Sequence, residues 1–326
     1  MISVAMCTYN GVNYLAEQLD SIVNQTVQPD EIIICDDGSI DDTVKVAKTI
    51  LKRWNGIFKI IINETNLGFI KNFEKAISLC QGDIIFLSDQ DDVWDRKKIE
   101  IMMDVFNTYP EAYMAFHDAE IVDKNLNLLF PSFWRSTLRF KYVDFLNHDY
   151  RKLYECNVVQ GSACAFKREI FEKARPFIQG AYHDEWLAIV ALASGDIIPI
   201  SDTLMKYRQD NNTLGGMPLS ISNKIAILIK ETSKKYNLDL KEIKRRIRLL
   251  ENFNIRYLNN NIAYPLDVTN YLVFLKIRCR YLEKLDLKLA FKIVKYLYFY
   301  PKLSRGINLY IKDLFEIFMC RKRHKV

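Results

Sequence analysis

Several signals that mark common protein classes are missing from this chain. Its seven cysteines include no CxxC pair, which argues against a zinc site or a disulfide framework and suits a reducing cytosol. The N-terminal segment ISVAMCTYN has no basic region and only a short apolar run, so we expect no signal peptide. No apolar stretch reaches the roughly 18 residues of a membrane span, so we expect none.

Two nucleotide-binding motifs are also absent. The chain contains neither GxGxxG nor GxxxxGK[ST], which excludes an ordinary dinucleotide site and a P-loop. A phosphate held without a glycine-rich cradle needs a metal ion, and Mg²⁺ takes oxygen ligands, commonly one or two carboxylates plus the substrate's own phosphates.

The chain does have the length and composition of an enzyme. Its 326 residues, 49% hydrophobic and 26% charged, suggest a soluble globular protein of about two domains. The net charge of +6 is unevenly distributed, because residues 217–326 hold 24 Lys and Arg against 9 Asp and Glu. That region carries +15 and residues 1–216 carry −9. We therefore expect an acidic domain over 1–216 and a basic domain over 217–326.

Strands and helices alternate along the first domain. Apolar runs predict strands, and apolar residues at helical spacing predict the helices between them. The expected strands are 2–8, 31–36, 58–63 and 83–89, and the expected helices are 12–25, 41–54, 68–80 and 96–109. Such alternation is typical of βαβ units in a mostly parallel α/β sheet with flanking helices.

An acidic cluster ends the fourth strand. In IIFLSDQDDVW, residues 84–94, three carboxylates (Asp89, Asp91 and Asp92) stand within four positions and repel one another when ionised. A turn is one explanation, and a divalent cation is the other. CTYNG and CDDGS also end strands, and ligands of such sheets bind beyond the carboxyl ends of the strands. We expect the three polar segments to meet in one crevice.

Five segments in order, VAMCTYNG, IIICDDGSIDDT, NLGFIKNFEKAI, GDIIFLSDQDDVW and YHDEWLAI, resemble the motifs of inverting family 2 glycosyltransferases with the GT-A fold. The resemblance spans about residues 1–216. SDQDDVW, HDEW and YRQDNN are most similar to bacterial rhamnosyltransferases of polysaccharide synthesis. This resemblance implies transfer of L-rhamnose from dTDP-L-rhamnose to a saccharide acceptor, with Mg²⁺ or Mn²⁺ as cofactor. Another donor, such as UDP-galactose or UDP-glucose, and an inactive nucleotide-sugar-binding scaffold are the alternatives.

The resemblance implies roles for particular residues. The nucleotide-binding set is Thr8, Tyr9, Asn10, Asp37, Lys71, Asp89 and Arg208, and the metal-binding set is Asp89, Asp91 and Asp92. Asp184 matches the general base and stands at the start of a helix that we expect to be amphipathic, although a helix N-cap is its competing interpretation. The expected acceptor-binding residues are Trp94, Gly161, Ser162, His183, Glu185 and Trp186.

A segment further along the chain, MKYRQDNNTLGG, resembles the family's lid over the diphosphate, with Tyr207 and Arg208 in that role. Asp210 stands where the related pattern has histidine, which leaves a third protein ligand to the metal open.

The basic region is helical by pattern, with Lys and Arg between apolar residues at i, i+3, i+4 and i+7. It is either a packing or dimerisation domain or a surface that binds an anionic leaflet. No nucleic-acid recognition module is present. We expect a cytoplasmic protein, peripheral on the inner face of the bacterial cytoplasmic membrane, with a lipid-linked acceptor and a possible homodimer as partners.

Overall fold

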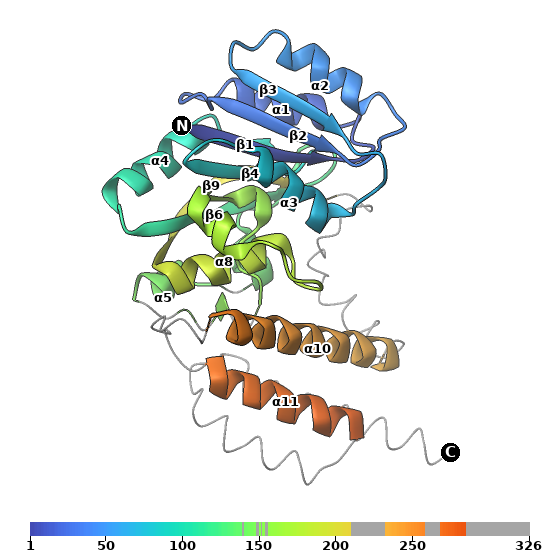
Figure 1. Cartoon of the computed structure of the whole chain (residues 1–326), viewed down its shortest axis with the longest axis vertical. Helices are drawn as coiled ribbons and strands as arrows, with labels where there is room; N and C mark the ends of the chain where they lie inside the picture. Colours follow the sequence, from blue (N-terminus) through green and yellow to red (C-terminus); the bar gives the residue numbers. More distant parts are fainter. Residues whose placement is uncertain are drawn as a thin grey trace. The chain divides into compact units, whose positions relative to one another are not determined.

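The chain divides into two compact units, Met1–Pro218 and Leu219–Val326. The computed structural model describes residues 1–138, 140–147, 150, 152–153, 156–209, 232–257 and 268–284. The predicted boundary between residues 216 and 217 lies outside these ranges and stays a prediction. Figure 1 shows the elements of both units, and each unit is described by itself.

The first unit contains the predicted alternation of strands and helices. Its strands are β1 Ile2–Thr8, β2 Glu31–Asp36, β3 Ile57–Ile62, β4 Ile84–Ser88, β5 Val93–Trp94, β6 Ala112–Val122, β7 Leu128–Phe130, β8 Cys164–Lys167 and β9 Asp196–Arg208. Its α-helices are α1 Leu15–Val23, α2 Thr43–Leu51, α3 Phe69–Leu79, α4 Lys98–Thr108, α5 Tyr142–Leu146, α7 Arg168–Ala174 and α8 His183–Ser194. A π-helical turn, η1 Trp134–Leu138, and a 3₁₀ turn, η2 Gly161–Ala163, complete the list.

The described strands form one sheet in the order β3-β2-β1-β4-β8-β6-β9-β5, with β7 paired to β6. β3, β2, β1 and β4 are parallel, as predicted. β8 runs antiparallel to both β4 and β6, and β5 runs antiparallel to β9. The α/β prediction is confirmed, and the sheet is parallel in one half and mixed in the other.

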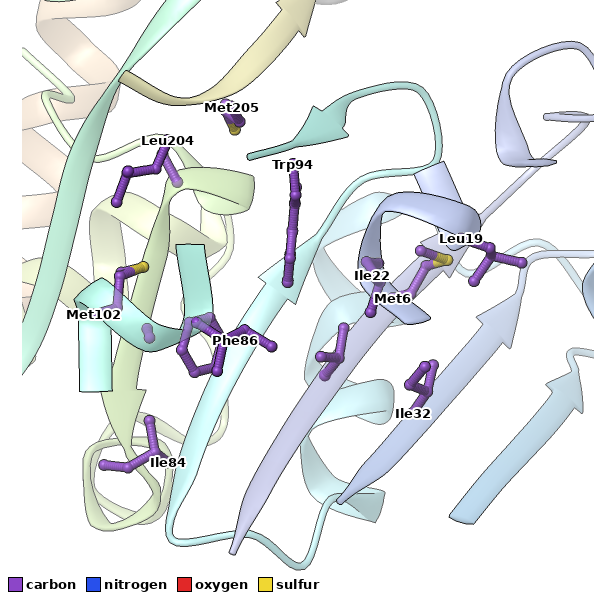
Figure 2. Close-up of a cluster of buried hydrophobic side chains, with 14 of the residues drawn as sticks. Met6, Leu19, Ile22, Ile32, Ile84, Phe86, Trp94, Met102, Leu204 and Met205 are labelled. Carbon is purple, nitrogen blue, oxygen red and sulfur yellow. The ribbon is translucent and has the colours of Figure 1, made fainter. Parts of the chain in front are cut away.

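Helices cover both faces of the sheet because alternate side chains of each strand point to opposite faces. Val4 and Met6 of β1 belong to the core that α1, α2 and α4 bury, and Figure 2 shows Met6 with Leu19 and Ile22 of α1. On the other face, α3 buries Phe73 among its core residues. The helices thereby seal the sheet and leave the strand ends as the place for polar chemistry.

Two helices of the first unit depart from what their sequence patterns favour. Asp42 occupies the N-cap position of α2, but its side chain makes no capping hydrogen bond; Asp41 instead accepts from the Thr43 N–H at 3.0 Å. The expectation that the helix of Asp184 is amphipathic is wrong, because every residue of α8 from His183 to Leu192 is buried. α8 lies between other elements, so it has no solvent face there.

In the second unit, α10 Thr232–Tyr257 and α11 Val268–Lys284 pack against each other. Ion pairs join Lys244 to Glu283 and Lys276 to Glu251, each at 2.7 Å. These helices agree with the predicted helical C-terminal region. Residues 210–231, 258–267 and 285–326, which include the remaining predicted helices and Asp210, lie outside the described residues. Within the described ranges, no helix combines the length and apolar character that a membrane crossing requires.

Candidate active site

The loop after β1 is tied to the loop after β4. The Tyr9 N–H donates to Gln90 Oε1 at 2.8 Å, and Gln90 Nε2 donates back to the Tyr9 carbonyl at 3.1 Å. Gly11 fits beneath this amide because a Cβ there would lie 2.1 Å from Gln90 Oε1. Tyr9 itself is 51% exposed, so its ring is available to a ligand while its backbone is held.

The loop after β2 is tied to the loop after β1. Thr8 Oγ1 donates to Asp36 Oδ2 at 2.6 Å, and the Asn10 N–H donates to Ser39 Oγ at 2.8 Å. Asp36 also accepts from the Ser39 N–H at 2.8 Å, so its carboxylate fixes the turn that follows β2. The polar segments at the ends of β1, β2 and β4 therefore meet, as expected.

Asp37 organises the loop that precedes α3. Its carboxylate accepts from the Leu67 N–H at 2.7 Å, the Gly68 N–H at 2.9 Å and Asn63 Nδ2 at 2.8 Å. Because the Asp37 side chain is buried, a nucleotide can contact only the part of its carboxylate that these bonds do not use. Lys71 lies exposed on the first turn of α3. The nucleotide-binding roles of both residues stay predictions.

The acidic cluster follows β4 directly. Asp89 and Asp91 are half-buried. Burial, then the charges of Asp92, Asp91 and Asp184, raises the pKa of Asp89 well above its usual range. Carboxylates so crowded are stabilised in their ionised form by a nearby cation, which fits a divalent metal ion at Asp89 and Asp91.

Asp92 differs from its two neighbours because its side chain is fully buried. Its Oδ2 accepts a short hydrogen bond from Ser162 Oγ, and its Oδ1 accepts from the Arg208 N–H at 3.3 Å. Over the described residues, no group of three or more His, Cys, Asp or Glu side chains is arranged to hold a metal ion. Both oxygens of the Asp92 carboxylate are thus engaged by the protein, unlike what a metal ligand requires, and the metal-binding roles of Asp89, Asp91 and Asp92 stay predictions.

Asp184 lies in the first turn of α8, but Tyr182 is the N-cap residue. Asp184 Oδ1 accepts from the Glu185 N–H at 2.7 Å. Burial raises the pKa of Asp184 from 3.8 to about 7, although the hydrogen bond from the Glu185 N–H lowers it. The N-cap interpretation is therefore wrong, and the pKa suits a general base near neutral pH.

His183 packs beside Asp184 in an aromatic environment. Its ring stacks on Phe73 at a centroid distance of 4.0 Å, and neither ring nitrogen has a hydrogen-bond partner. Burial lowers its pKa to about 3, so it is neutral. A Cβ on Gly161 would lie 2.8 Å from His183 Nε2, which explains the glycine at that position.

All six residues of the predicted acceptor-binding set are buried, and three of them carry large side chains enclosed by protein. Trp186 is fully buried and its indole N–H donates to the Ala174 carbonyl at 2.8 Å. Trp94 is 4% exposed, and Glu185 is buried on α8. In this conformation these side chains pack the core around the site. Their acceptor-binding role stays a prediction.

Arg208 is engaged within the protein. Its Nε donates to the Asp91 carbonyl at 2.8 Å, its guanidinium also bonds to the Lys124 carbonyl, and it forms an ion pair with Glu17. It also lies over the Tyr14 ring, 4.4 Å from the centroid. Arg208 thus fixes the backbone of the acidic loop, and any contact with a diphosphate requires an exchange of partners. Tyr207 is half-buried, and burial and the three aspartates raise its pKa.

Two residues at the site were missed from the sequence. Gln90 joins the β1 and β4 loops, although it stands inside SDQDD. Lys98 is fully buried beneath the acidic cluster. A signal for Lys98 did exist, because it lies four residues before the buried Met102 on α4 and so shares its apolar face.

Comparison with known proteins agrees with this architecture. The model of Glycosyl transferase family 2 matches residues 3–175. An uncharacterized glycosyltransferase of Haemophilus influenzae is 27% identical over 335 residues, which cover 95% of this chain and 98% of that protein.

Solved structures show the fold. TarS of S. aureus superposes with a TM-score of 0.56 at 16% identity, covering 93% of this chain and 73% of that one. The mannosyltransferase PcManGT of Pyrobaculum calidifontis gives 0.55 at 15% identity, covering 95% and 78%. The fold is GT-A, the protein is a glycosyltransferase, and the chain belongs to glycosyl transferase family 2.

Proposed function

We propose that the chain transfers a sugar from a nucleotide diphosphate sugar to a saccharide acceptor, with inversion and with Mg²⁺ or Mn²⁺ as cofactor. One observation carries the proposal. Asp184, whose pKa is raised to about 7 by burial, packs against Gly161, and the next residue, Ser162, donates a hydrogen bond to Asp92 of the acidic cluster. A base for the acceptor and carboxylates for the donor's metal therefore belong to one site.

The chain's own residues divide the work. Asp184 accepts the proton of the attacking hydroxyl, because a hydroxyl is a poor nucleophile until it loses that proton. The loops of Tyr9, Asn10 and Asp37 hold the nucleotide, and Asp89 and Asp91 hold the metal. A bound Mg²⁺ or Mn²⁺ would neutralise charge on the departing diphosphate. Gly161, which lacks a side chain, allows the acceptor to approach Asp184 closely.

The donor that we propose is dTDP-L-rhamnose, on the resemblance of SDQDDVW and HDEW to rhamnosyltransferase segments. Other donors occur on the same fold: TarS is described in complex with UDP-GlcNAc, and PcManGT with GDP-Man and Mn²⁺. UDP-glucose and UDP-galactose are therefore the alternatives. An inactive scaffold is disfavoured because a protein without chemistry need not keep Asp184 and the paired carboxylates.

A thermal-shift panel tests the donor. Each nucleotide sugar is added with and without Mn²⁺. A ligand that binds only the folded state stabilises it by RT ln(1 + [L]/Kd) and therefore raises the Tm. We expect dTDP-L-rhamnose with Mn²⁺ to give the largest shift. A larger shift from a UDP-sugar would replace the donor and keep the rest of the proposal.

A substitution tests the metal site. Asp91→Asn should abolish transfer and remove the Mn²⁺ dependence of nucleotide binding, while Asp104→Asn, an exposed aspartate on α4, should change neither. Near-normal turnover of Asp91→Asn at saturating metal would contradict the assignment.

The acceptor that we propose is lipid-linked, with the basic second unit on an anionic membrane surface at the inner face of the cytoplasmic membrane. The charge of +15 over residues 217–326 supports this. A homodimer through the same unit is the competing proposal.

A further inference from the structure

A lysine lies buried beneath the candidate metal site. Lys98, the first residue of α4, is fully buried. Its Nζ donates a short hydrogen bond to the Ser162 carbonyl and lies 3.7 Å from the centroid of the Trp94 ring. A buried ammonium is costly unless a nearby charge or hydrogen bonds compensate it, so a compensating group must be close.

The carboxylate linked to Lys98, through Ser162, is that of Asp92, which is also fully buried. Burial raises the pKa of Asp92 and lowers the pKa of Lys98, and the charge of each residue partly offsets this shift in the other. Ser162 joins the two, because its Oγ donates to Asp92 and its carbonyl accepts from Lys98. Ser162 of the η2 turn is thus hydrogen-bonded to both buried charged groups.

Ser162 also connects the two halves of the chemistry. The residue before it, Gly161, packs against Asp184, because a Cβ on Gly161 would lie 3.8 Å from the Asp184 Cβ. The residue before Asp92 is Asp91, a candidate metal ligand. Ser162 therefore links the acidic loop to the turn that lies beside the candidate base.

We propose that Asp92, Ser162 and Lys98 form a buried positioning unit. This unit sets the acidic loop against the η2 turn, which lies beside Asp184, and Asp92 works through the unit instead of ligating the metal. This inference rests on the proposed function. It reassigns Asp92 and Ser162, which the family resemblance had placed with the metal and the acceptor, and it gives the buried Lys98 a role.

The unit has a distinctive response to substitution. Removing one charge of a buried pair leaves the other without compensation, whereas removing both leaves no buried charge. Lys98→Met should therefore lower Tm strongly, and Lys98→Met with Asp92→Asn should melt higher than Lys98→Met alone. Residues that act separately would instead give losses of Tm that add. This readout uses the ligand-free full chain, so it does not depend on the donor or on activity.

Mn²⁺ affinity separates positioning from ligation. Mn²⁺ is titrated calorimetrically into the full chain in the presence of UDP. We expect Asp91→Asn to weaken Mn²⁺ binding more than Asp92→Asn does. Asp92→Asn alone and Asp92→Asn combined with Lys98→Met should bind Mn²⁺ with equal affinity. Ser162→Ala should lower kcat while the UDP affinity stays within about threefold, since a displaced base affects the chemical step more than binding. Lys97→Met, at an exposed neighbour, is the matched control.

Several results would overturn the inference. One is loss of Mn²⁺ binding in Asp92→Asn as complete as in Asp91→Asn, and another is additive losses of Tm. If Lys98→Met does not fold but the double variant does, the pairing is supported. If neither variant folds, Ser162→Ala decides: a Tm and a turnover equal to those of wild type would reject the unit. Failure of wild type to bind Mn²⁺ with UDP would count against a UDP-sugar donor, and failure with both UDP and dTDP would count against the proposed function. Both outcomes leave the Tm comparison intact.

Discussion

Asp184 is the residue on which the chemistry depends. We expect Asp184→Asn to keep donor affinity and to lower turnover by roughly 10²–10⁴, the usual contribution of general acid–base catalysis. Asp184 is not the N-cap of α8, so the amide should not unfold the helix. Donor titrations and initial rates are compared with those of Asp196→Asn, an exposed aspartate at the start of β9. Loss of donor binding together with activity would make Asp184 structural.

The pKa of Asp184 predicts a pH dependence. A base must be ionised to accept a proton, so kcat/KM should fall as pH drops through about 7; the charge of a bound metal would move that midpoint lower. Because folding raises the pKa of this carboxyl, ionisation of Asp184 lowers the free energy of unfolding. The loss grows as pH rises from 3.8 through about 7. Asp184→Asn should therefore melt no lower than wild type at alkaline pH. A flat rate profile across this range, or a lower Tm, would contradict the assignment.

At this scale the sequence identified the polar residues and not their partners. Thr8, Asn10 and Asp89 could be placed together because they follow parallel strands. The enclosure of Trp186 and the internal bonds of Arg208 could not be predicted, because they depend on packing between segments far apart in the chain. Arg208, for example, pairs with Glu17.

At the scale of elements, hydrophobic periodicity predicted the helices and strands around β1 to β4. It could not predict that β8 runs antiparallel between β4 and β6, because a short buried strand reads the same in either direction. It also suggested an amphipathic α8, although neighbouring elements bury both faces of that helix. Local pattern specifies an element, and its neighbours decide its exposure.

The turn between α3 and β4 offers a stability test away from the site. A Cβ on Gly82 would lie 2.7 Å from the Ser3 backbone nitrogen and 2.9 Å from the Met1 carbonyl, neither of which can swing aside as a side chain does. We expect Gly82→Ala to lose about 1–3 kcal/mol of unfolding free energy, the usual cost of overpacking. Urea denaturation measures it, with Gln81→Ala, at an exposed neighbour, as control.

Turnover per folded molecule should be unchanged in Gly82→Ala, because the turn lies at the amino end of β4 and the site lies at the carboxyl end. A loss of activity greater than the loss of folded protein would show that strain travels along the strand.

At the scale of the whole molecule, charge separates the two units. We predict that the full chain sediments with anionic vesicles and that salt weakens this binding, since each Lys or Arg near such a surface contributes about 1 kcal/mol. Arg246 is a poor choice for the test, because it is buried and paired with Glu242, and Lys244 joins the two helices. Lys241, Arg248 and Arg280 are exposed and can be changed to Glu with less damage to the helix pair.

Reversal of those three charges should release the protein from anionic vesicles and leave its Tm nearly unchanged. Change of the half-buried Glu251 to Lys is unsuitable as a control because Glu251 pairs with Lys276. Reversal of three exposed residues of the first unit, Lys48 on α2 and Lys52 and Arg53 just after it, is the matched set. Equal sedimentation on neutral lipid, or none lost on reversal, would favour packing or dimerisation for the second unit.

The hydrogen bonds that tie the loops after β1, β2 and β4 to one another have a thermodynamic consequence. Tyr9, Asn10 and Asp37 are already held by Gln90, Ser39 and the N–H groups before α3. A nucleotide that enters these loops orders little additional backbone, so the conformational entropy lost on binding is small. Calorimetry should then give a heat-capacity change that reflects the apolar area the nucleotide covers, without the larger value that accompanies coupled folding.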